Sequence, residues 1–364
     1  MTATEQQPQG RPVPPRTTLL RARNLVQEFP VRGAGGVKGG VVHAVSNVSF
    51  DVYAGETLGV VGETGSGKST LARSVIQAPR PKSGEVEFQG TDLMKLRRRD
   101  LKQARRQMQM VYQDPFGSLN PRWRISELVE EPLIGYGEGS ASSRKRRVDE
   151  LLDLVGLDPS QYARRRPHEI SGGQCQRVAI ARAIALDPAL VICDEAVSSL
   201  DVLIQAQVLN LFEKLRRDLN LSYLFIAHDL ALVKQVSDRV AVMYLGQLAE
   251  IGPAEGIYRQ PLHPYTSALL DSIPRIDPAT GRANKPVSLP GEPPSPVDPP
   301  SGCRFRTRCP RAQLKCAEEE PQLVELLPGH QAACHFPLTV PESELPPRPA
   351  GATQAAPDAS VAVG

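Results

Sequence analysis

Short apolar runs alternate along this chain with longer stretches of helical periodicity. The runs with the clearest boundaries are residues 56–61, 189–193 and 221–227. Each has the length of one strand, and a parallel strand buried on both faces appears as a continuous apolar run. Strands separated by helical segments indicate an α/β fold in which helices cover a mostly parallel sheet. The sequence therefore predicts a doubly wound α/β core.

Polar residues follow each of these three runs. The first run leads into a glycine-rich loop, the second is followed by Asp194 and Glu195, and the third by His228. Open α/β sheets hold their ligands just beyond the carboxyl ends of their strands. We therefore expect these residues to share one site at that edge of the sheet.

The loop after the first run matches the P-loop pattern, with a strand before it and a helical pattern after it. It consists of Gly62, Glu63, Thr64, Gly65, Ser66, Gly67, Lys68, Ser69 and Thr70. Its glycines allow backbone N–H groups to surround phosphate oxygens at a helix N-terminus. Lys68 is then expected to reach the β- and γ-phosphates, and Ser69 to offer its hydroxyl to Mg²⁺. The flanking elements argue against an accidental glycine-rich turn, so the loop predicts binding of ATP with Mg²⁺.

An acidic pair ends the second run. Carboxylates at the end of a buried strand are costly unless they meet a metal ion or water. Asp194 fits a Mg²⁺ partner, and Glu195 fits the group that orients the attacking water. The alternative is that both carboxylates cap the helix that follows.

A second glycine-containing element precedes a helical segment at residues 175–185. It consists of Ser171, Gly172, Gly173 and Gln174. A serine, paired glycines and a helix N-terminus make a second phosphate-binding element. Because one chain rarely needs two such elements for one γ-phosphate, a dimer is expected, in which each subunit's second element closes on the other's nucleotide.

The remaining segments suggest a modular chain. Residues 1–16 and 341–364 have the composition of disordered tails. Helix-like pieces at 126–133 and 143–155 indicate a helical subdomain at about 114–180, inserted in a domain that spans 17–273. A proline-rich region with four of the six cysteines follows at 274–340.

Composition excludes several classes of partner. The formal net charge is only +3, whereas a nucleic-acid binder usually concentrates far more positive charge, and the arginine groups at 144–147 and 164–166 fit a solvated helix face. No run approaches the roughly 20 apolar residues that span a bilayer. The N-terminal residues lack the apolar region of a secretory signal. We expect a cytosolic protein that meets a membrane only through partners.

Together these motifs make the chain similar to the ATP-binding subunits of ABC transporters. The resemblance implies ATP hydrolysis and assigns four further roles. Phe29 would stack on adenine. Gln113 would sense the γ-phosphate and Mg²⁺ and transmit their presence to the membrane subunits. Asp201 would belong to a loop that crosses the dimer interface. His228 would bind the γ-phosphate and hold the water of Glu195.

The sequence departs from the family pattern just after the predicted catalytic glutamate. Ala196 stands where proline is usual, Val197 where threonine is common, and Ser199 where alanine is common. None of these changes removes a reacting group. Since proline fixes φ and alanine does not, the loop is expected to be less rigid than in the family.

Four longer segments narrow the resemblance to the oligopeptide/dipeptide importer ATPases. They are residues 112–121, 167–177, 261–266 and 301–310. This resemblance implies peptide import at the cytoplasmic face of the cell membrane. The implied partners are a second, non-identical ABC ATPase subunit, two membrane permease subunits and an extracytoplasmic solute-binding protein, with no nucleic acid. Two rival functions are ATP hydrolysis that powers the import of nickel or another small solute, and a soluble ABC ATPase without a transport role.

Four cysteines mark the C-terminal region. They are Cys303, Cys309, Cys316 and Cys334. Four thiolates in a small region can bind an iron–sulfur cluster or Zn²⁺, and the resemblance favours a 4Fe-4S cluster. Their spacing matches neither zinc ribbons nor bacterial ferredoxins, so free thiols are the alternative. Cys175 and Cys193 are interpreted instead as small buried hydrophobic residues.

Overall fold

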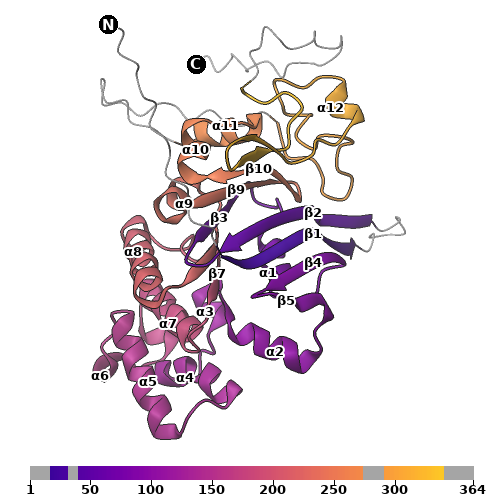
Figure 1. Ribbon diagram of the computed structural model, residues 1–364. Coiled ribbons are helices and arrows are strands. Elements are labelled where there is room, and N and C mark those ends of the chain that lie inside the picture. The colour runs from indigo at the N-terminus through magenta and orange to yellow at the C-terminus, as the bar shows by residue number, and fades with distance from the viewer. Residues whose placement is uncertain (1–16, 32–39, 274–290, 340–364) are drawn as a thin grey trace, which may run out of the picture.

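The computed structural model describes residues 17–31, 40–273 and 291–339. Two sheets form the middle of the structure, with a group of helices at one end and a smaller C-terminal region at the other (Figure 1). Both predicted tails, and the stretch where the predicted C-terminal region begins, lie outside the described residues. The predicted domain boundaries remain predictions.

The larger sheet contains the three strands that the apolar runs predicted. Its strand order is β11-β12-β10-β9-β3-β8-β7-β6. The strands from β9 to β6 pair in parallel, and β10, β12 and β11 extend the sheet with antiparallel pairs. The bounds are β3 Thr57–Val61, β6 Met108–Val111, β7 Leu190–Asp194, β8 Ser222–Ile226, β9 Arg239–Tyr244, β10 Gln247–Pro253, β11 Val324–Leu327 and β12 His330–Ala332. The predicted parallel α/β core is thus confirmed.

A second, antiparallel sheet has the order β2-β1-β4-β5. Its strands are β1 Thr18–Val31, β2 Gly40–Tyr53, β4 Ser83–Phe88 and β5 Thr91–Asp92. The short helix α1 (Lys68–Val75) packs between the two sheets, where Leu71 and Val75 are buried. This position fixes the N-terminus of α1, and hence the loop before it, against both sheets.

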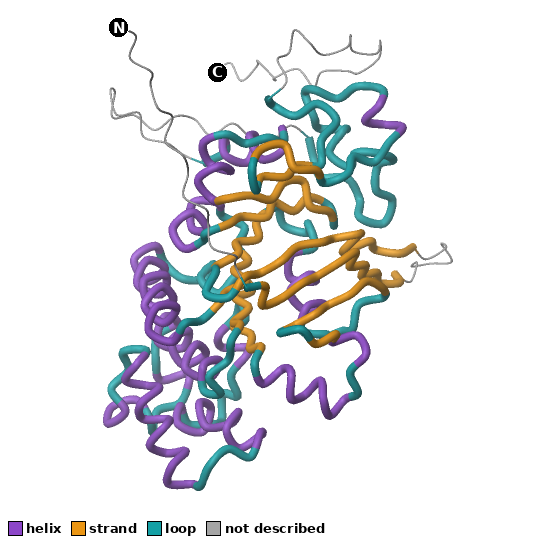
Figure 2. Tube along the Cα trace, in the orientation of Figure 1, coloured by secondary structure: helices purple, strands orange, loops and turns teal. Residues whose placement is uncertain are grey.

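Helices cover the opposite face of the larger sheet and gather away from the antiparallel sheet (Figure 2). The remaining helices are α2 Arg98–Arg106, α3 Pro115–Ser118, α4 Ile125–Tyr136, α5 Ala141–Leu154, α6 Pro159–Tyr162, α7 Gly172–Ile184, α8 Val202–Leu219, α9 Leu230–Val236, α10 Ala254–Arg259, α11 Pro264–Asp271 and α12 Lys315–Glu318, with short 3-10 turns at Leu93–Lys95 and Pro167–Glu169. The helix-like pieces of the sequence correspond to α4 and α5. Among the described residues, no helix combines the length and apolar character needed to cross a bilayer.

Alternate side chains of the parallel strands enter two different cores. In β7, Leu190 and Ile192 pack with α1 and the antiparallel sheet, whereas Val191 and Cys193 pack with the helices. All four side chains are buried. Burial on both faces explains why the strand shows a continuous apolar run in the sequence.

A buried carboxylate joins the C-terminal hairpin to the rest of the fold. Glu250 on β10 is fully buried, and its oxygens accept the N–H groups of Leu262 (2.8 Å) and His263 (2.9 Å). His330 Nε2 lies 2.6 Å from the same carboxylate. Three partners compensate the cost of burying this group, so β10, β12 and the start of α11 are held together.

His263 predicts a pH dependence of stability. Burial lowers its pKa to about 4, with Glu250 opposing the shift, and its Nδ1 accepts the N–H of Tyr265 (3.0 Å). The unfolded imidazole takes a proton near pH 6.5, whereas the folded one stays neutral to about pH 4. The contribution of the neutral His263 to the free energy of unfolding is therefore complete above about pH 6.5. Falling pH then removes on the order of 3 kcal/mol of this free energy, as the unfolded chain takes up the proton that the folded chain excludes.

Denaturant unfolding at pH 7 and at about pH 4.5 tests this expectation. The wild type should lose more unfolding free energy over this interval than His263→Asn, whose amide oxygen can still accept the Tyr265 N–H. His335→Asn, a change at a histidine in the same part of the fold, should behave like the wild type. Equal losses in the wild type and His263→Asn would contradict the prediction.

Candidate functional site

The P-loop connects the carboxyl end of β3 to the N-terminus of α1. Gly62, Gly65 and Gly67 all have positive φ, at 152°, 81° and 101°. At Gly67 a Cβ would also lie 2.0 Å from the carbonyl oxygen of Ala44. Only glycine satisfies both demands at this position, which explains the glycine at the start of the helix.

Lys68 is buried inside the loop it terminates. Its Nζ donates to the carbonyl oxygens of Gly62 (2.7 Å) and Glu63 (2.9 Å) and lies 3.4 Å from Ser66 Oγ. Burial lowers the pKa of Lys68, and Glu195, Asp194 and Glu63 oppose that shift. The ammonium thus sits at the centre of the site with backbone carbonyls as its partners.

Ser69 and Asp194 meet across the site. The Ser69 hydroxyl donates to Asp194 Oδ1 at 2.6 Å. Asp194 is the last residue of β7, one position inside the strand rather than beyond it, and is only 4% exposed. A hydroxyl and a carboxylate in contact provide oxygen ligands of the kind that Mg²⁺ binds together with nucleotide phosphates.

Three side chains converge beside this pair. Gln113 Nε2 donates to Glu195 Oε2 at 2.8 Å, and His228 Nδ1 lies 4.0 Å from the same oxygen. Gln113 follows β6, Glu195 follows β7 and His228 follows β8, so neighbouring parallel strands deliver all three. The expectation of one shared edge is confirmed for these residues.

The backbone of Glu195 is strained. Its φ is +50°, an uncommon value for a residue with a Cβ. Hydrogen bonds hold this conformation: Glu195 N–H donates to Ile226 O (3.0 Å), and the Ser198 N–H and hydroxyl both donate to Glu195 O (3.1 and 2.9 Å). Residues held in uncommon backbone conformations cluster at functional sites, so this conformation supports a functional role for Glu195.

The second glycine element lies at the N-terminus of α7. Ser171 caps the helix by accepting the Gln174 N–H (3.3 Å), and Gln174 Oε1 accepts the Ser171 N–H (3.0 Å). A Cβ at Gly173 would lie 2.5 Å from Ile204 Cγ2, because α8 packs closely against α7 there. Asp201 caps α8 through the Ile204 N–H (3.1 Å).

The surface next to these caps is apolar and exposed. Val202 and Leu203, directly after Asp201, are 78% and 77% exposed. The contacts of Ser171 and Gln174 are local to the α6–α8 region, whereas the P-loop belongs to β3 and α1. None of these hydrogen bonds joins the second element to the P-loop.

Phe29 lies on β1 opposite Val42 of β2. It is 38% exposed. Two residues along β2, the Ala44 carbonyl packs against Gly67 of the P-loop. Phe29 is thus an exposed aromatic ring on the strand pair that borders the P-loop, and its role toward adenine stays a prediction.

Sequence reasoning missed three contacts that hold the P-loop from outside. Glu63 N–H donates to the Tyr265 hydroxyl oxygen (2.9 Å), and the Gly246 N–H donates to Ser66 O (2.8 Å). Both oxygens of the Glu63 carboxylate accept hydrogen bonds from Arg308 (2.7 and 3.0 Å). Tyr265 and Arg308 lie in segments that marked the family resemblance, which is the signal that could have drawn attention to them.

The four C-terminal cysteines lie close enough to influence one another, but the predicted 4Fe-4S cluster is not supported. Burial raises the pKa of Cys303 to about 11 and that of Cys309 and Cys334 to about 12. All four thiols, Cys316 included, are free. Within the described ranges, no group of three or more His, Cys, Asp or Glu side chains could hold a metal ion. Cys175 and Cys193 are fully buried, as expected.

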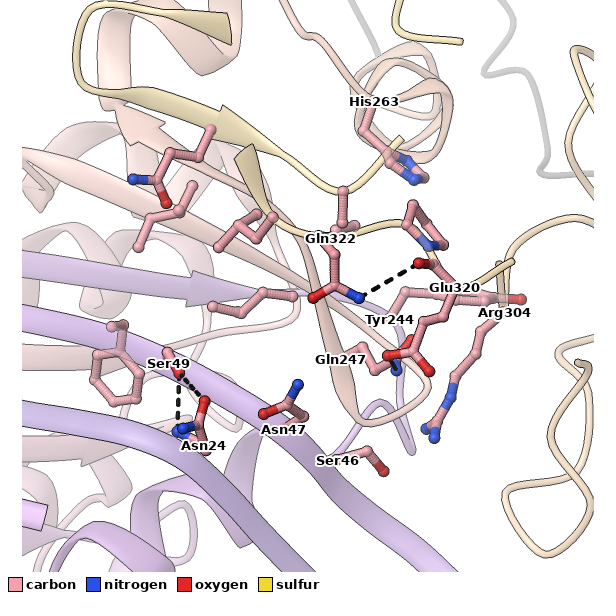
Figure 3. Close-up of a pocket in the computed structure, with 18 of the residues that line it drawn as sticks. Asn24, Ser46, Asn47, Ser49, Tyr244, Gln247, His263, Arg304, Glu320 and Gln322 are labelled. Atoms are coloured by element: carbon pink, nitrogen blue, oxygen red, sulfur yellow. Dashed lines mark hydrogen bonds between the residues drawn. The ribbon is translucent and has the colours of Figure 1, made fainter. Parts of the chain in front are cut away.

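A polar pocket of about 380 Å³ lies elsewhere, between the β1–β2 pair and the C-terminal region. Figure 3 shows Asn24, Ser49, Arg304 and Glu320 around it. None of the P-loop residues, nor Asp194, Glu195 or His228, lines this pocket. It is therefore distinct from the site at the strand ends.

Comparison with solved structures places the fold. The chain matches a dimeric post-hydrolysis structure of the ATP-binding cassette MJ0796 bound to ADP and Pi, with 27% identity and a TM-score of 0.57 over 65% of this chain and 98% of that one. It also matches CbiO1 from Clostridium perfringens, part of the ABC transporter complex CbiONQ, in fold (23% identity, TM-score 0.58, 67% and 92% covered). Fold and site define an ABC-type ATPase.

Comparison of sequences narrows the class to a family. Residues 45–198 match the ABC transporter family, and residues 249–316 match the oligopeptide/dipeptide transporter C-terminal region. The chain is 48% identical over 321 residues to the oligopeptide transport ATP-binding protein AppF of Bacillus subtilis, which covers 88% of this chain and 97% of AppF. It is 47% identical over 331 residues to a probable peptide ABC transporter ATP-binding protein, y4tS, of Sinorhizobium fredii (90% and 93% covered). The chain belongs to the oligopeptide/dipeptide family of ABC transporter ATP-binding proteins.

Proposed function

We propose that this chain hydrolyses ATP to power the import of peptides through a membrane ABC transporter. The observation that carries the proposal is the similarity to AppF, a protein named for oligopeptide transport, which extends over nearly the whole of that protein. The match to the oligopeptide/dipeptide C-terminal region supports the same cargo class. Peptide is thus inferred from relatives, because an ATPase subunit does not itself contact the cargo.

The site supports a division of roles in hydrolysis. When ATP is bound, the P-loop N–H groups and Lys68 would hold its phosphates. Ser69, Asp194 and Gln113 would hold Mg²⁺, which offsets the charge that develops on the phosphates. In the structure Lys68 donates to the backbone carbonyls of Gly62 and Glu63 at the centre of the loop. A short movement of its side chain would exchange these carbonyls for phosphate oxygens of ATP.

Glu195 would orient the attacking water and accept its proton. Gln113 and His228 face its carboxylate from the neighbouring strands. An amide donor at 2.8 Å fixes the position of one oxygen, which leaves the other to bind water. His228, about half exposed, would contact the γ-phosphate and hold the same water.

A dimer would complete the site. The hydrogen bonds of the second glycine element, Ser171 to Gln174, and of Asp201 stay local to the α6–α8 region of one chain. Each chain would supply these residues to the nucleotide of the other. The second subunit is proposed to be a similar, non-identical ABC ATPase. Apolar Val202 and Leu203 are exposed on the surface next to these residues, in agreement with burial by a partner.

Two permease subunits and an extracytoplasmic solute-binding protein would complete the transporter. The described residues contain no membrane-crossing helix, and ABC transporter membership implies membrane partners. We place the chain at the cytoplasmic face of the cell membrane, where ATP is available. A role on nucleic acid finds no support in the net charge of +3.

The cargo class can be tested by uptake of labelled di-, tri- and longer peptides, and of nickel, into cells that lack the chain. Restoring the wild-type chain should restore uptake of peptides and leave nickel uptake unchanged. If only nickel uptake were restored, the role as a transport ATPase would stand, but the assignment of peptides as the cargo would be overturned. If neither returned, although the chain was present and its permeases were expressed, a soluble ABC ATPase without a transport role would replace the proposal.

A further inference from the structure

Glu63 of the P-loop is held by a segment of chain 245 residues away. Both of its carboxylate oxygens accept hydrogen bonds from the Arg308 guanidinium, at 2.7 and 3.0 Å. The Arg308 side chain is 4% exposed and that of Glu63 is 23% exposed. A two-pronged arginine–carboxylate pair of this kind fixes orientation as well as distance, and in a partly desolvated setting it is screened little by salt.

Arg308 is itself rigidly placed. Its guanidinium lies 3.4 Å from the Tyr244 hydroxyl and 5.9 Å from the centre of that ring. Tyr244, Tyr265 and Phe305 form an aromatic cluster with ring centres 4.6 to 5.3 Å apart. Phe305 is three residues before Arg308, so the cluster anchors the C-terminal region at the position from which Arg308 reaches the loop.

Further contacts from the same direction reach the P-loop backbone. Arg304 donates to the carbonyl of Leu245, and the next residue, Gly246, donates its N–H to Ser66 O at 2.8 Å. The Tyr265 hydroxyl accepts the N–H of Glu63. Side chains from the C-terminal region thus brace the loop at Glu63 directly and at Ser66 through the turn between β9 and β10.

The charge of Glu63 makes this brace relevant to nucleotide binding. The Glu63 carbonyl accepts a hydrogen bond from Lys68 Nζ, so the backbone of Glu63 is in direct contact with the side chain that is predicted to bind phosphate. An unpaired carboxylate so near a polyphosphate would repel it and would also be free to draw Lys68 away. Paired with Arg308, the carboxylate is neutralised and points out of the loop.

We propose that Arg308 is a positioning residue of the ATPase site, which neutralises Glu63 and so keeps the P-loop and Lys68 ready for the phosphates of ATP. The C-terminal region is then a structural part of the nucleotide site rather than an appendage to the ATPase domain. This inference rests on the proposed function, since it concerns the same ATP site.

The test is the equilibrium affinity of the full chain for ATP, together with KM and kcat, in four variants. Arg308→Met keeps the apolar stem but removes the guanidinium, and it should weaken ATP binding about tenfold, with a smaller change in kcat. Adding Glu63→Gln to Arg308→Met should recover most of this loss, because the repelling charge is then gone. Glu63→Gln alone completes the double-mutant cycle, because it measures the effect of removing the carboxylate while Arg308 is present.

The matched control is Arg306→Met. Arg306 lies in the same loop, but its guanidinium donates to the Ser301 carbonyl and hydroxyl and not to the P-loop. It should bind ATP within about twofold of the wild type. The inference is overturned if Arg308→Met binds ATP as the wild type does, or if its loss persists undiminished after Glu63→Gln, since a merely loosened C-terminal region would not be rescued by charge removal. A wild-type chain that bound no ATP would overturn the proposed function as well.

Discussion

Replacement of Glu195 by Gln is expected to slow ATP hydrolysis by at least about a hundredfold while ATP still binds. The variant keeps the size of the side chain and its contact with Gln113, but it loses the carboxylate that would accept the proton of the attacking water. The backbone at position 195 is strained (φ +50°), and the carboxylate lies beside Gln113 and His228. Phosphate release under saturating ATP, with the partner subunit present, measures the effect.

A surface change of the same chemistry provides the control. Glu150 lies on α5 and its side chain is 55% exposed, so Glu150→Gln should hydrolyse ATP at the wild-type rate. A Glu195→Gln chain that also hydrolysed ATP at the wild-type rate would show that another group activates the water. A loss of both binding and hydrolysis would instead assign Glu195 to nucleotide binding.

Replacement of Lys68 by Ala is expected to weaken ATP binding by about a hundredfold or more. The ammonium lies at the centre of the P-loop, where it donates to the Gly62 and Glu63 carbonyls. From this position it would contact both the β- and the γ-phosphate. No other cation donates to these carbonyls among the contacts of the described residues. Equilibrium binding of ATP to the purified chain measures the loss directly.

Lys145→Ala, a change at an exposed lysine on α5, serves as its control and should bind ATP normally. The two main variants should also separate from each other: Glu195→Gln should bind ATP without hydrolysing it, and Lys68→Ala should do neither. If Lys68→Ala bound ATP as tightly as the wild type, the P-loop would not be the phosphate site.

Local patterns were sufficient to predict the elements that carry the site. The apolar runs correspond to β3, β7 and β8 within one residue at each end, because strands buried on both faces leave a continuous signal. The helix predicted at residues 175–185 is α7, Gly172–Ile184, which begins at the Ser171 cap. The P-loop was predictable because positive φ at three positions admits little but glycine.

Long-range pairing was not predictable from periodicity. The continuation of the parallel sheet into β10, β12 and β11 depends on strands about 80 residues apart, which meet around the buried Glu250–His330 contact. The Arg308–Glu63 pair likewise joins segments 245 residues apart. Neither strand periodicity nor motif spacing contains that information, since each residue could pair with many others of opposite charge.

The four C-terminal cysteines led to a prediction that the structure does not support. Their number and their occurrence in a small proline-rich region suggested a cluster, but thiols that lie near one another do not make a metal site unless their sulfur atoms converge on one point. In the described residues they do not form such a group. Iron and acid-labile sulfide in protein purified without oxygen would decide whether a cluster forms in the cell.

Accumulation of a labelled tripeptide in proteoliposomes that contain the complete transporter tests the central claim most directly. The chain, its partner ATPase and both permeases are reconstituted with the binding protein on the peptide side and ATP on the other. The account predicts ATP-dependent accumulation with the wild-type chain and none with Glu195→Gln. Undiminished accumulation with Glu195→Gln would contradict it, because transport would then proceed without hydrolysis at this site.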